Sequence, residues 1–110
     1  MTLLQQMASE RRQRRELVRV QTLQQLRNAL RQLLPASRVV VFGSLTQSGR
    51  FEEGSDVDVA LEAEPAGLSV YQLSSLLAER LGRPVDVVLL PECRFREKIL
   101  KEGEPWTLRD

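Results

Sequence analysis

The sequence predicts one α/β domain, a small mixed β-sheet with helices packed mainly on one face. Three short apolar runs, at residues 38–42, 56–62 and 85–90, alternate with segments of helical periodicity. The chain has 110 residues, 42% of them apolar and 28% charged, which is typical of a globular protein with a single core.

The first predicted element is a helix over about residues 9–34. It belongs to an amphipathic N-terminal segment, 1–34, which we expect to pack on a core formed by residues 35–110. Leucines recur at the spacing of a buried helical stripe, and Pro35 ends the pattern. Four arginines in the first turns are too dense for a core face, so these turns are expected to be exposed or bound to a partner: Arg11, Arg12, Arg14 and Arg15.

The first apolar run, 38–42, lacks polar alternation, which indicates a strand buried on both faces. A short helical turn is expected at 44–48, followed by a loop and a second strand at 56–62. Ser69 and Gln72 form a capping box for the next helix, where Tyr71 is expected to pack and Gly82 to end the element.

The last two predicted elements are a strand at 85–90 and a helix over about 93–102, which ends at Gly103 and Pro105. Trp106 lies beyond them. We expect its ring to cover the edge of the core, with stacking on a base as the alternative.

The net charge of +1 is unevenly distributed. Residues 1–34 carry seven arginines and two glutamates, whereas the remainder carries nine basic and thirteen acidic side chains. A basic first helix indicates contact with an acidic partner or RNA, and the alternative is an ordinary solvated face.

Composition also excludes several classes of site. The chain has no histidine, which excludes a Ser-His-Asp triad, a Cys-His pair and imidazole-bound zinc. Acid–base or metal chemistry must therefore use carboxylates. No apolar run approaches a membrane span, no signal peptide is recognisable, and Cys93 is the single cysteine, so we expect a cytoplasmic protein with no membrane contact.

The most informative pattern is Gly43-Ser44 after the first strand, followed after eleven intervening residues by Asp56-Val57-Asp58. Alternate residues of a strand share a face, so Asp56 and Asp58 are expected to project together. Two neighbouring carboxylates favour a divalent cation between them, and Gly-Ser at a strand-to-helix turn offers backbone N–H groups to a phosphate.

Asp86 adds a third carboxylate, the one polar residue of its strand. If the strands at 56–62 and 85–90 are neighbours, Asp86 can join Asp56 and Asp58 around a pair of metal ions. Two such ions stabilise the attacking and leaving oxygens in phosphoryl transfer, and magnesium suits carboxylates combined with phosphate oxygens. Each aspartate alone would be ordinary, as a cap or a solvent-facing residue, and only the combination predicts a site.

This combination resembles the nucleotidyltransferase signature of the DNA polymerase β superfamily, over about residues 20–105. The short length resembles its minimal nucleotidyltransferase (MNT) branch, which includes MntA-type antitoxins paired with HEPN toxins. The segment 95–103 is similar to the tail common in that branch. The resemblance implies a polymerase-β-like palm core.

The resemblance also implies residue roles. Asp56 and Asp58 would hold two magnesium ions that bridge the phosphates of ATP, and Asp86 would ligate the ion nearer the nucleophile and help remove its proton. Gly43 and Ser44 would cradle the β and γ phosphates. The implied reaction transfers AMP to a hydroxyl and releases pyrophosphate, and in MntA-type proteins the acceptor is a tyrosine of the HEPN toxin.

The chain departs from the family pattern at Leu45-Thr46, where many relatives carry a basic residue; Arg50, Thr46 or Gln47 could substitute for it. Two other functions remain open from the sequence. One is a non-catalytic antitoxin that neutralises its partner by contact, and the other is nucleotidyl transfer to a small molecule or RNA.

Overall fold

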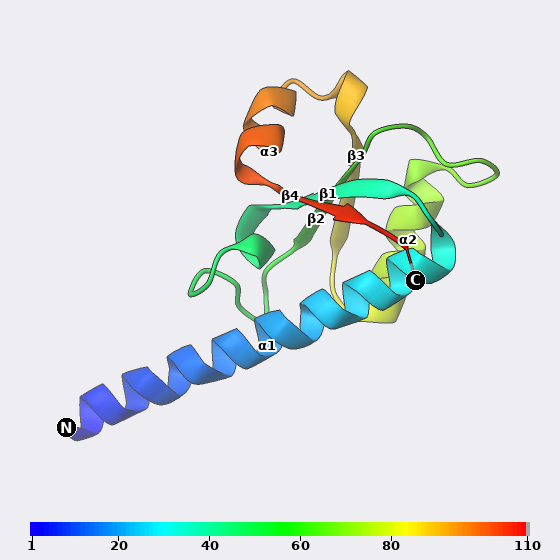
Figure 1. Cartoon of the computed structure of the whole chain (residues 1–110). Helices are drawn as coiled ribbons and strands as arrows, with labels where there is room; N and C mark the ends of the chain where they lie inside the picture. Colours follow the sequence, from blue (N-terminus) through cyan, green and yellow to red (C-terminus); the bar gives the residue numbers. More distant parts are fainter. Residues whose placement is uncertain (110) are drawn as a thin grey trace.

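Four strands form one mixed sheet in the computed structural model, which describes residues 1–109 (Figure 1). The strands are β1 (Arg38–Phe42), β2 (Val57–Leu61), β3 (Val85–Leu89) and β4 (Glu104–Thr107), in the spatial order β3-β2-β1-β4. β1 is antiparallel to both β2 and β4, whereas β2 and β3 are parallel. The mixed sheet predicted from the sequence is confirmed.

The two longer helices pack on one face of this sheet, and the third covers part of the other. α1 (Leu3–Leu33) and α2 (Val70–Leu81) enclose the main core with inward residues of all four strands, while α3 (Arg96–Glu102) seals a smaller cluster around Val40 and Ile99. Two 3-10 turns, η1 (Gly43–Thr46) and η2 (Leu90–Glu92), follow β1 and β3. The predicted division of the chain at residue 34 stays a prediction.

The end of the chain differs from the prediction. The last helix begins at Arg96 rather than near residue 93, because residues 90–92 form η2 with Pro91 near its start. An additional strand, β4, then pairs with β1, where Arg38 lies opposite Thr107. Pro105 lacks a backbone N–H and is compatible with an edge strand, which is where β4 lies.

Trp106 covers the edge of the core, as the sequence predicted, and only 4% of it is exposed. The guanidinium of Arg27, on α1, lies 4.2 Å from the centre of its ring, and the indole N–H donates to Glu104 at 3.1 Å. The ring therefore joins α1 to β4.

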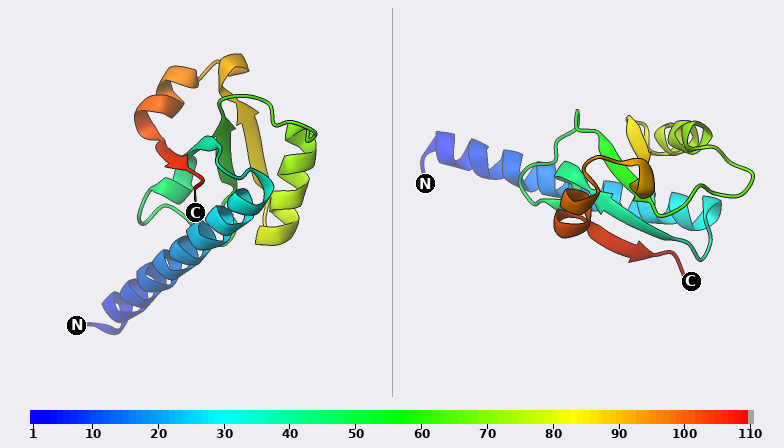
Figure 2. Two further views of the ribbon diagram at one scale, coloured as in Figure 1. Left: turned by 45° about the vertical axis from the view of Figure 1, so that its right-hand side comes forward. Right: turned by 90° about the horizontal axis from the view of Figure 1, so that it is seen from above.

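α1 begins earlier than the predicted residue 9, because Thr2 and Gln5 form a reciprocal capping box. Its second half supplies Leu26 and Leu30 to the main core, whereas its first half projects from the rest of the molecule (Figures 1 and 2). The chain is accordingly elongated, with extents of 54 × 28 × 24 Å. Large apolar side chains remain exposed along this helix: Leu3, Leu4, Met7, Leu17 and Val20.

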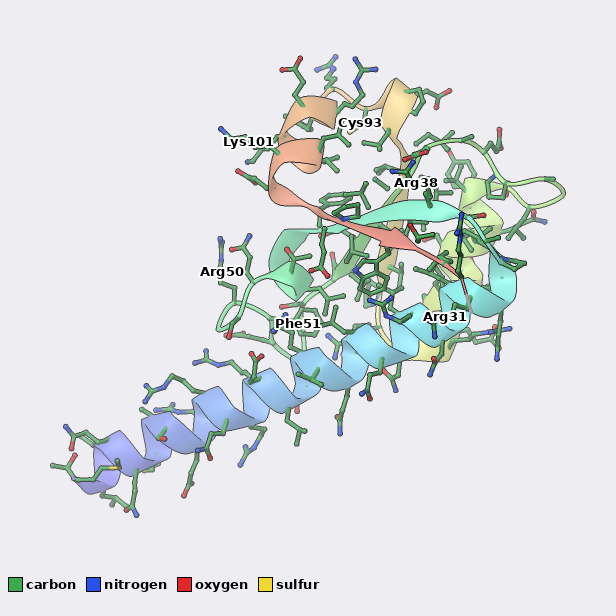
Figure 3. The ribbon with its side chains drawn as sticks, viewed as in Figure 1. Arg31, Arg38, Arg50, Phe51, Cys93 and Lys101 are labelled. Carbon is green, nitrogen blue, oxygen red and sulfur yellow. The ribbon has the colours of Figure 1, made fainter. Side chains whose placement is uncertain are left out.

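Phe51 anchors the loop between η1 and β2. Its side chain is 1% exposed within the main core, and Figure 3 shows it between the loop and α1. The Arg83 guanidinium lies 4.6 Å from the ring centre and donates to the backbone carbonyls of Glu52 and Ser55. Phe51 and Arg83 therefore together hold the loop against the rest of the fold.

Within residues 1–109, no helix combines the length and the apolar character that a membrane crossing requires.

Phe51→Ala is expected to destabilise the protein by about 3–5 kcal/mol, because it removes a fully buried aromatic side chain and leaves a cavity. Phe95→Ala, at a ring that is 66% exposed, is the matched control and is expected to change stability by about 0.5 kcal/mol or less. Urea unfolding followed by circular dichroism measures both. Equal losses would show that Phe51 does not anchor the loop.

Candidate active site

The parallel register of β2 and β3 brings two of the predicted carboxylates side by side. Asp58 lies directly opposite Asp86, and both alternate with residues of the main core, such as Val57 and Val85. Because alternate residues of a strand share a face, both aspartates lie on the face that α3 partly covers.

Gly43 lies against Asp58, because the antiparallel register pairs Phe42 with Asp58. Gly43 has a φ of +78°, and a Cβ built on it would clash with Oδ2 of Asp58. Glycine is therefore required here both by its backbone conformation and by the space that the carboxylate occupies. η1 begins at Gly43 as a single 3-10 turn, which the Thr46 hydroxyl closes by donating to the Gly43 carbonyl at 2.9 Å.

Asp58 has the most perturbed environment of the three carboxylates. Burial raises its pKa from 3.8 to about 6, and the negative charges of Asp86 and Asp56 add to the effect. A half-buried carboxylate beside two others has unfavourable charge repulsion, which a cation would relieve.

These groups lie in a cleft of about 750 Å³ that runs along the α3 face to the start of α2. Gly43, Ser44, Asp58 and Asp86 line it together, so the structure brings four of the five predicted site residues to one place. Asp56 precedes β2, is exposed, and acts on the site through its charge on Asp58.

The donor chemistry fits a hard divalent cation such as Mg²⁺, because the cleft presents carboxylate oxygens and a backbone turn, with Cys93 as a single thiol and no histidine. Within residues 1–109, however, no three Asp, Glu, Cys or His side chains are positioned to hold a metal ion together. The predicted ligation by all three aspartates therefore stays a prediction, and Asp58 with Asp86 is the pair that the register supplies.

Two cations line the same cleft. Arg50 bonds to Gln47 through Nη1 and Oε1 at 2.9 Å, and Figure 3 shows its side chain extending away from α1. Lys98 projects from α3. Three residues were candidates to replace the basic residue that many relatives carry after the Gly-Ser turn. Arg50 and Gln47 both line the cleft, whereas the Thr46 hydroxyl donates to the Gly43 carbonyl.

Two aromatic rings also border the cleft. Tyr71 is 83% exposed and Phe95 66% exposed. The prediction that Tyr71 packs was wrong, because it stands at the first turn of α2, beside the cleft rather than over the core.

Sequence reasoning missed Lys98, Tyr71 and Phe95 as cleft residues. No sequence pattern identified Lys98, because its position at the cleft depends on how α3 packs on the sheet. The two aromatics gave no signal either, since an aromatic residue at a helix start is usually part of the core.

α1 holds the turn that carries Gly43 and Ser44. Arg19 donates to the carbonyl of Leu45 at 3.1 Å and forms a hydrogen-bonded ion pair with Glu16. Oε2 of Glu16 also accepts a hydrogen bond from the Ser48 hydroxyl at 3.0 Å. The hydrogen bonds to Arg19 and Ser48 lower the pKa of Glu16. Arg15 reaches Glu52 of the following loop at 3.3 Å. One face of α1 thus positions η1 and the loop after it.

Gly43→Ala is expected to cost about 2–3 kcal/mol of stability, because strain at positive φ adds to the clash with Asp58. Gly49→Ala is the matched control: its φ of +86° imposes similar strain, but no atom lies within 4 Å of the added Cβ. We expect it to cost about 1 kcal/mol.

A double-mutant cycle tests the cause. In an Asp58→Ala background the cost of Gly43→Ala should fall to that of Gly49→Ala, as measured by urea unfolding. A cost that is unchanged by Asp58→Ala would contradict the contact.

Asp58→Asn is expected to stabilise the metal-free protein near pH 7.5 by about 1 kcal/mol, after allowance for the partial exposure of Asp58. The sign follows from the raised pKa: the folded state holds the Asp58 proton more tightly than the unfolded chain. The free energy of unfolding of the wild type, compared with that of Asp58→Asn, is therefore highest below pH 3.8. This advantage is lost as the pH rises to about 6. Thermal unfolding in EDTA from pH 3.5 to 8 measures the difference, and a pH-independent gap would contradict this origin.

Comparison with known proteins agrees with this geometry. A solved structure described as a crystal structure of a toxin-antitoxin with AMP-PNP superposes with a TM-score of 0.60 and 24% sequence identity, covering 76% of this chain and 72% of that one. At this identity the match shows the fold alone. A search of curated proteins found no match.

The family model "Polymerase beta, Nucleotidyltransferase" matches residues 24–110, which is most of the chain and includes the whole cleft. The chain belongs to the polymerase beta nucleotidyltransferase family.

Proposed function

We propose that the protein is an antitoxin that transfers AMP from ATP to a tyrosine hydroxyl of a HEPN-type toxin, with magnesium as cofactor. The observation that carries the proposal is the convergence of Asp58, Asp86, Gly43 and Ser44 on one cleft of a nucleotidyltransferase-family fold. The proposal takes the nucleotide and the toxin partner from the similar structure, which is described as a toxin-antitoxin with AMP-PNP.

The nucleotide part of the proposal rests on the cleft. Its volume of about 750 Å³ is within the range of small-molecule sites. Ser44 and the backbone of η1 offer hydrogen bonds to phosphate oxygens, while Arg50 and Lys98 supply positive charge. The exposed rings of Tyr71 and Phe95 offer faces on which a planar base stacks.

Magnesium, when bound by Asp58, Asp86 and Asp56, would neutralise phosphate charge and polarise the α-phosphate. The chain's own groups would do the rest. Asp86, exposed at the mouth of the cleft, would accept the proton of the attacking hydroxyl. The new bond joins the acceptor oxygen to the α-phosphorus, the bond from that phosphorus to the bridging oxygen breaks, and pyrophosphate leaves with the electron pair. Arg50 and Lys98 would stabilise the charge that develops on it.

The protein acceptor is supported by the exposed surroundings of the cleft. Tyr71 and Phe95, both exposed, line the cleft, and Leu100 of the nearby α3 is 55% exposed. A cleft with an apolar rim suits a docked protein segment better than a small polar acceptor. ATP as donor and a free Cys93 are compatible with a cytoplasmic setting.

The test combines purified protein, ATP, Mg²⁺ and the protein product of the neighbouring gene, which the proposal expects to be a HEPN-type toxin, and reads intact masses. We expect adenylate adducts on the toxin, lost when a toxin tyrosine is replaced. Asp58→Asn and Asp86→Asn should lower the rate on the order of 100-fold or more. Glu53→Gln, an exposed carboxylate outside the cleft, is the matched control and should leave the rate unchanged.

The alternatives give different results in the same assay. Toxin neutralisation that survives Asp58→Asn without any adduct would favour a contact antitoxin. Adenylate appearing on added RNA rather than on the toxin would favour an RNA acceptor, which the basic α1 could bind.

A further inference from the structure

The projecting part of α1 carries an exposed seam with the spacing of a coiled coil. Residues recur alternately four and three positions apart, and every one is exposed: Leu3, Met7, Glu10, Arg14, Leu17 and Gln21. Three of these positions are apolar, Leu3, Met7 and Leu17, and apolar residues at such positions are what packs one helix along another. The other three, Glu10, Arg14 and Gln21, are polar, so their partners decide the register. The core of this chain uses a different side of α1, marked by Thr22, Leu26 and Leu30.

The seam is complementary to itself in one orientation. When a second copy of α1 runs antiparallel, with the symmetry axis beside residue 12, Met7 faces Leu17 of the second copy and Glu10 faces Arg14. Leu3 then faces Gln21. Each contact occurs twice because a two-fold interface is self-complementary. A parallel pairing in register would instead place Glu10 on Glu10 and Arg14 on Arg14.

We propose that two copies of this chain form a dimer through an antiparallel coiled coil of their projecting α1 helices. Charge complementarity selects the second copy as occupant. Within residues 1–109 neither Glu10 nor Arg14 makes an ion pair, and the antiparallel register provides a partner for both.

The dimer leaves the rest of the molecule accessible. The first half of α1 projects from the rest of the chain (Figure 2), and the seam lies away from the core-facing side of α1, so the proposed pairing would leave the two cores on opposite sides of the helix pair. No residue of α1 lines the cleft described above, and both clefts stay open. The dimer is therefore independent of the reaction proposed for the cleft.

Like charges limit the affinity. Arg15 and Arg19 are compensated by Glu52 and Glu16, but Arg11 and Arg12 make no ion pair within residues 1–109, and Arg11 flanks the seam next to the symmetry axis in both copies. Repulsion between the arginines of the two α1 helices is therefore expected to limit the dissociation constant to the micromolar range. Dimerisation should strengthen as salt screens this repulsion. Binding of RNA to the same arginines would weaken with salt.

Sedimentation velocity of the full chain, free of nucleotide and toxin, tests the proposal. We expect a concentration-dependent dimer. Glu10→Arg and Arg14→Glu alone should each raise the dissociation constant about tenfold or more, because each creates two like-charge contacts. Arg12→Glu is the matched control for Arg14→Glu, since it changes charge equally off the seam, and it should not weaken the dimer.

Mixing the two weakened variants is the decisive step. Glu10→Arg and Arg14→Glu chains should form a heterodimer with wild-type affinity, because every Glu10–Arg14 contact then pairs opposite charges, and the double variant should dimerise with itself. Circular dichroism confirms that α1 remains helical in each variant.

Three results would overturn the proposal. The chain could stay monomeric at several hundred micromolar, its dimer could persist unchanged in both single variants, or the mixture could fail to associate although each chain is helical. Association that requires added RNA and is lost at high salt would assign the arginines to nucleic acid instead.

Discussion

The contact between the Asp58 carboxylate and the bare backbone of Gly43 constrains the geometry of the whole cleft. It exists because the β1–β2 register pairs Phe42 with Asp58, and the β2–β3 register then places Asp86 beside the same carboxylate. A slip of one residue in β2 would turn Asp58 into the main core and expose Val57. The buried alternate residues therefore fix the register, and the register assembles the site. Burial and the neighbouring carboxylates raise the pKa of Asp58, so this assembly is expected to cost stability when nothing compensates the charge.

α1 links the main core to the turn η1, which follows β1 outside the sheet. Its second half contributes to the main core, its middle holds η1 through Arg19 and Glu16, and its first half is unoccupied by the rest of the chain. The Arg19–Glu16 pair is effective because Arg19 is partly buried and donates to two groups at once, the Glu16 carboxylate and the Leu45 carbonyl. Truncating α1 would therefore affect the turn at Gly43 as well as the core.

The sequence predicted those parts of the fold that repeat a strong local pattern. The apolar runs identified β1, β2 and β3, and the carboxylates of the site were visible because aspartate is unusual inside such runs. β4 was missed because Glu104 and Pro105 disfavour strands, and only pairing with β1 makes the segment extended. Phe51 was missed because polar and glycine residues surround it, so its burial depends on contacts with α1 and Arg83 that are distant in sequence. Lys98 reaches the cleft by the same kind of tertiary placement.

The positions of the single tryptophan and the single tyrosine have a practical consequence. The single tryptophan, Trp106, is buried beneath Arg27 at the junction of α1 and β4, whereas the single tyrosine, Tyr71, stands exposed beside the cleft. Indole and phenol fluorescence differ in wavelength, so one unlabelled chain carries two separate optical reporters. Emission from Trp106 follows the docking of α1 on the sheet, and emission from Tyr71 follows whatever enters the cleft.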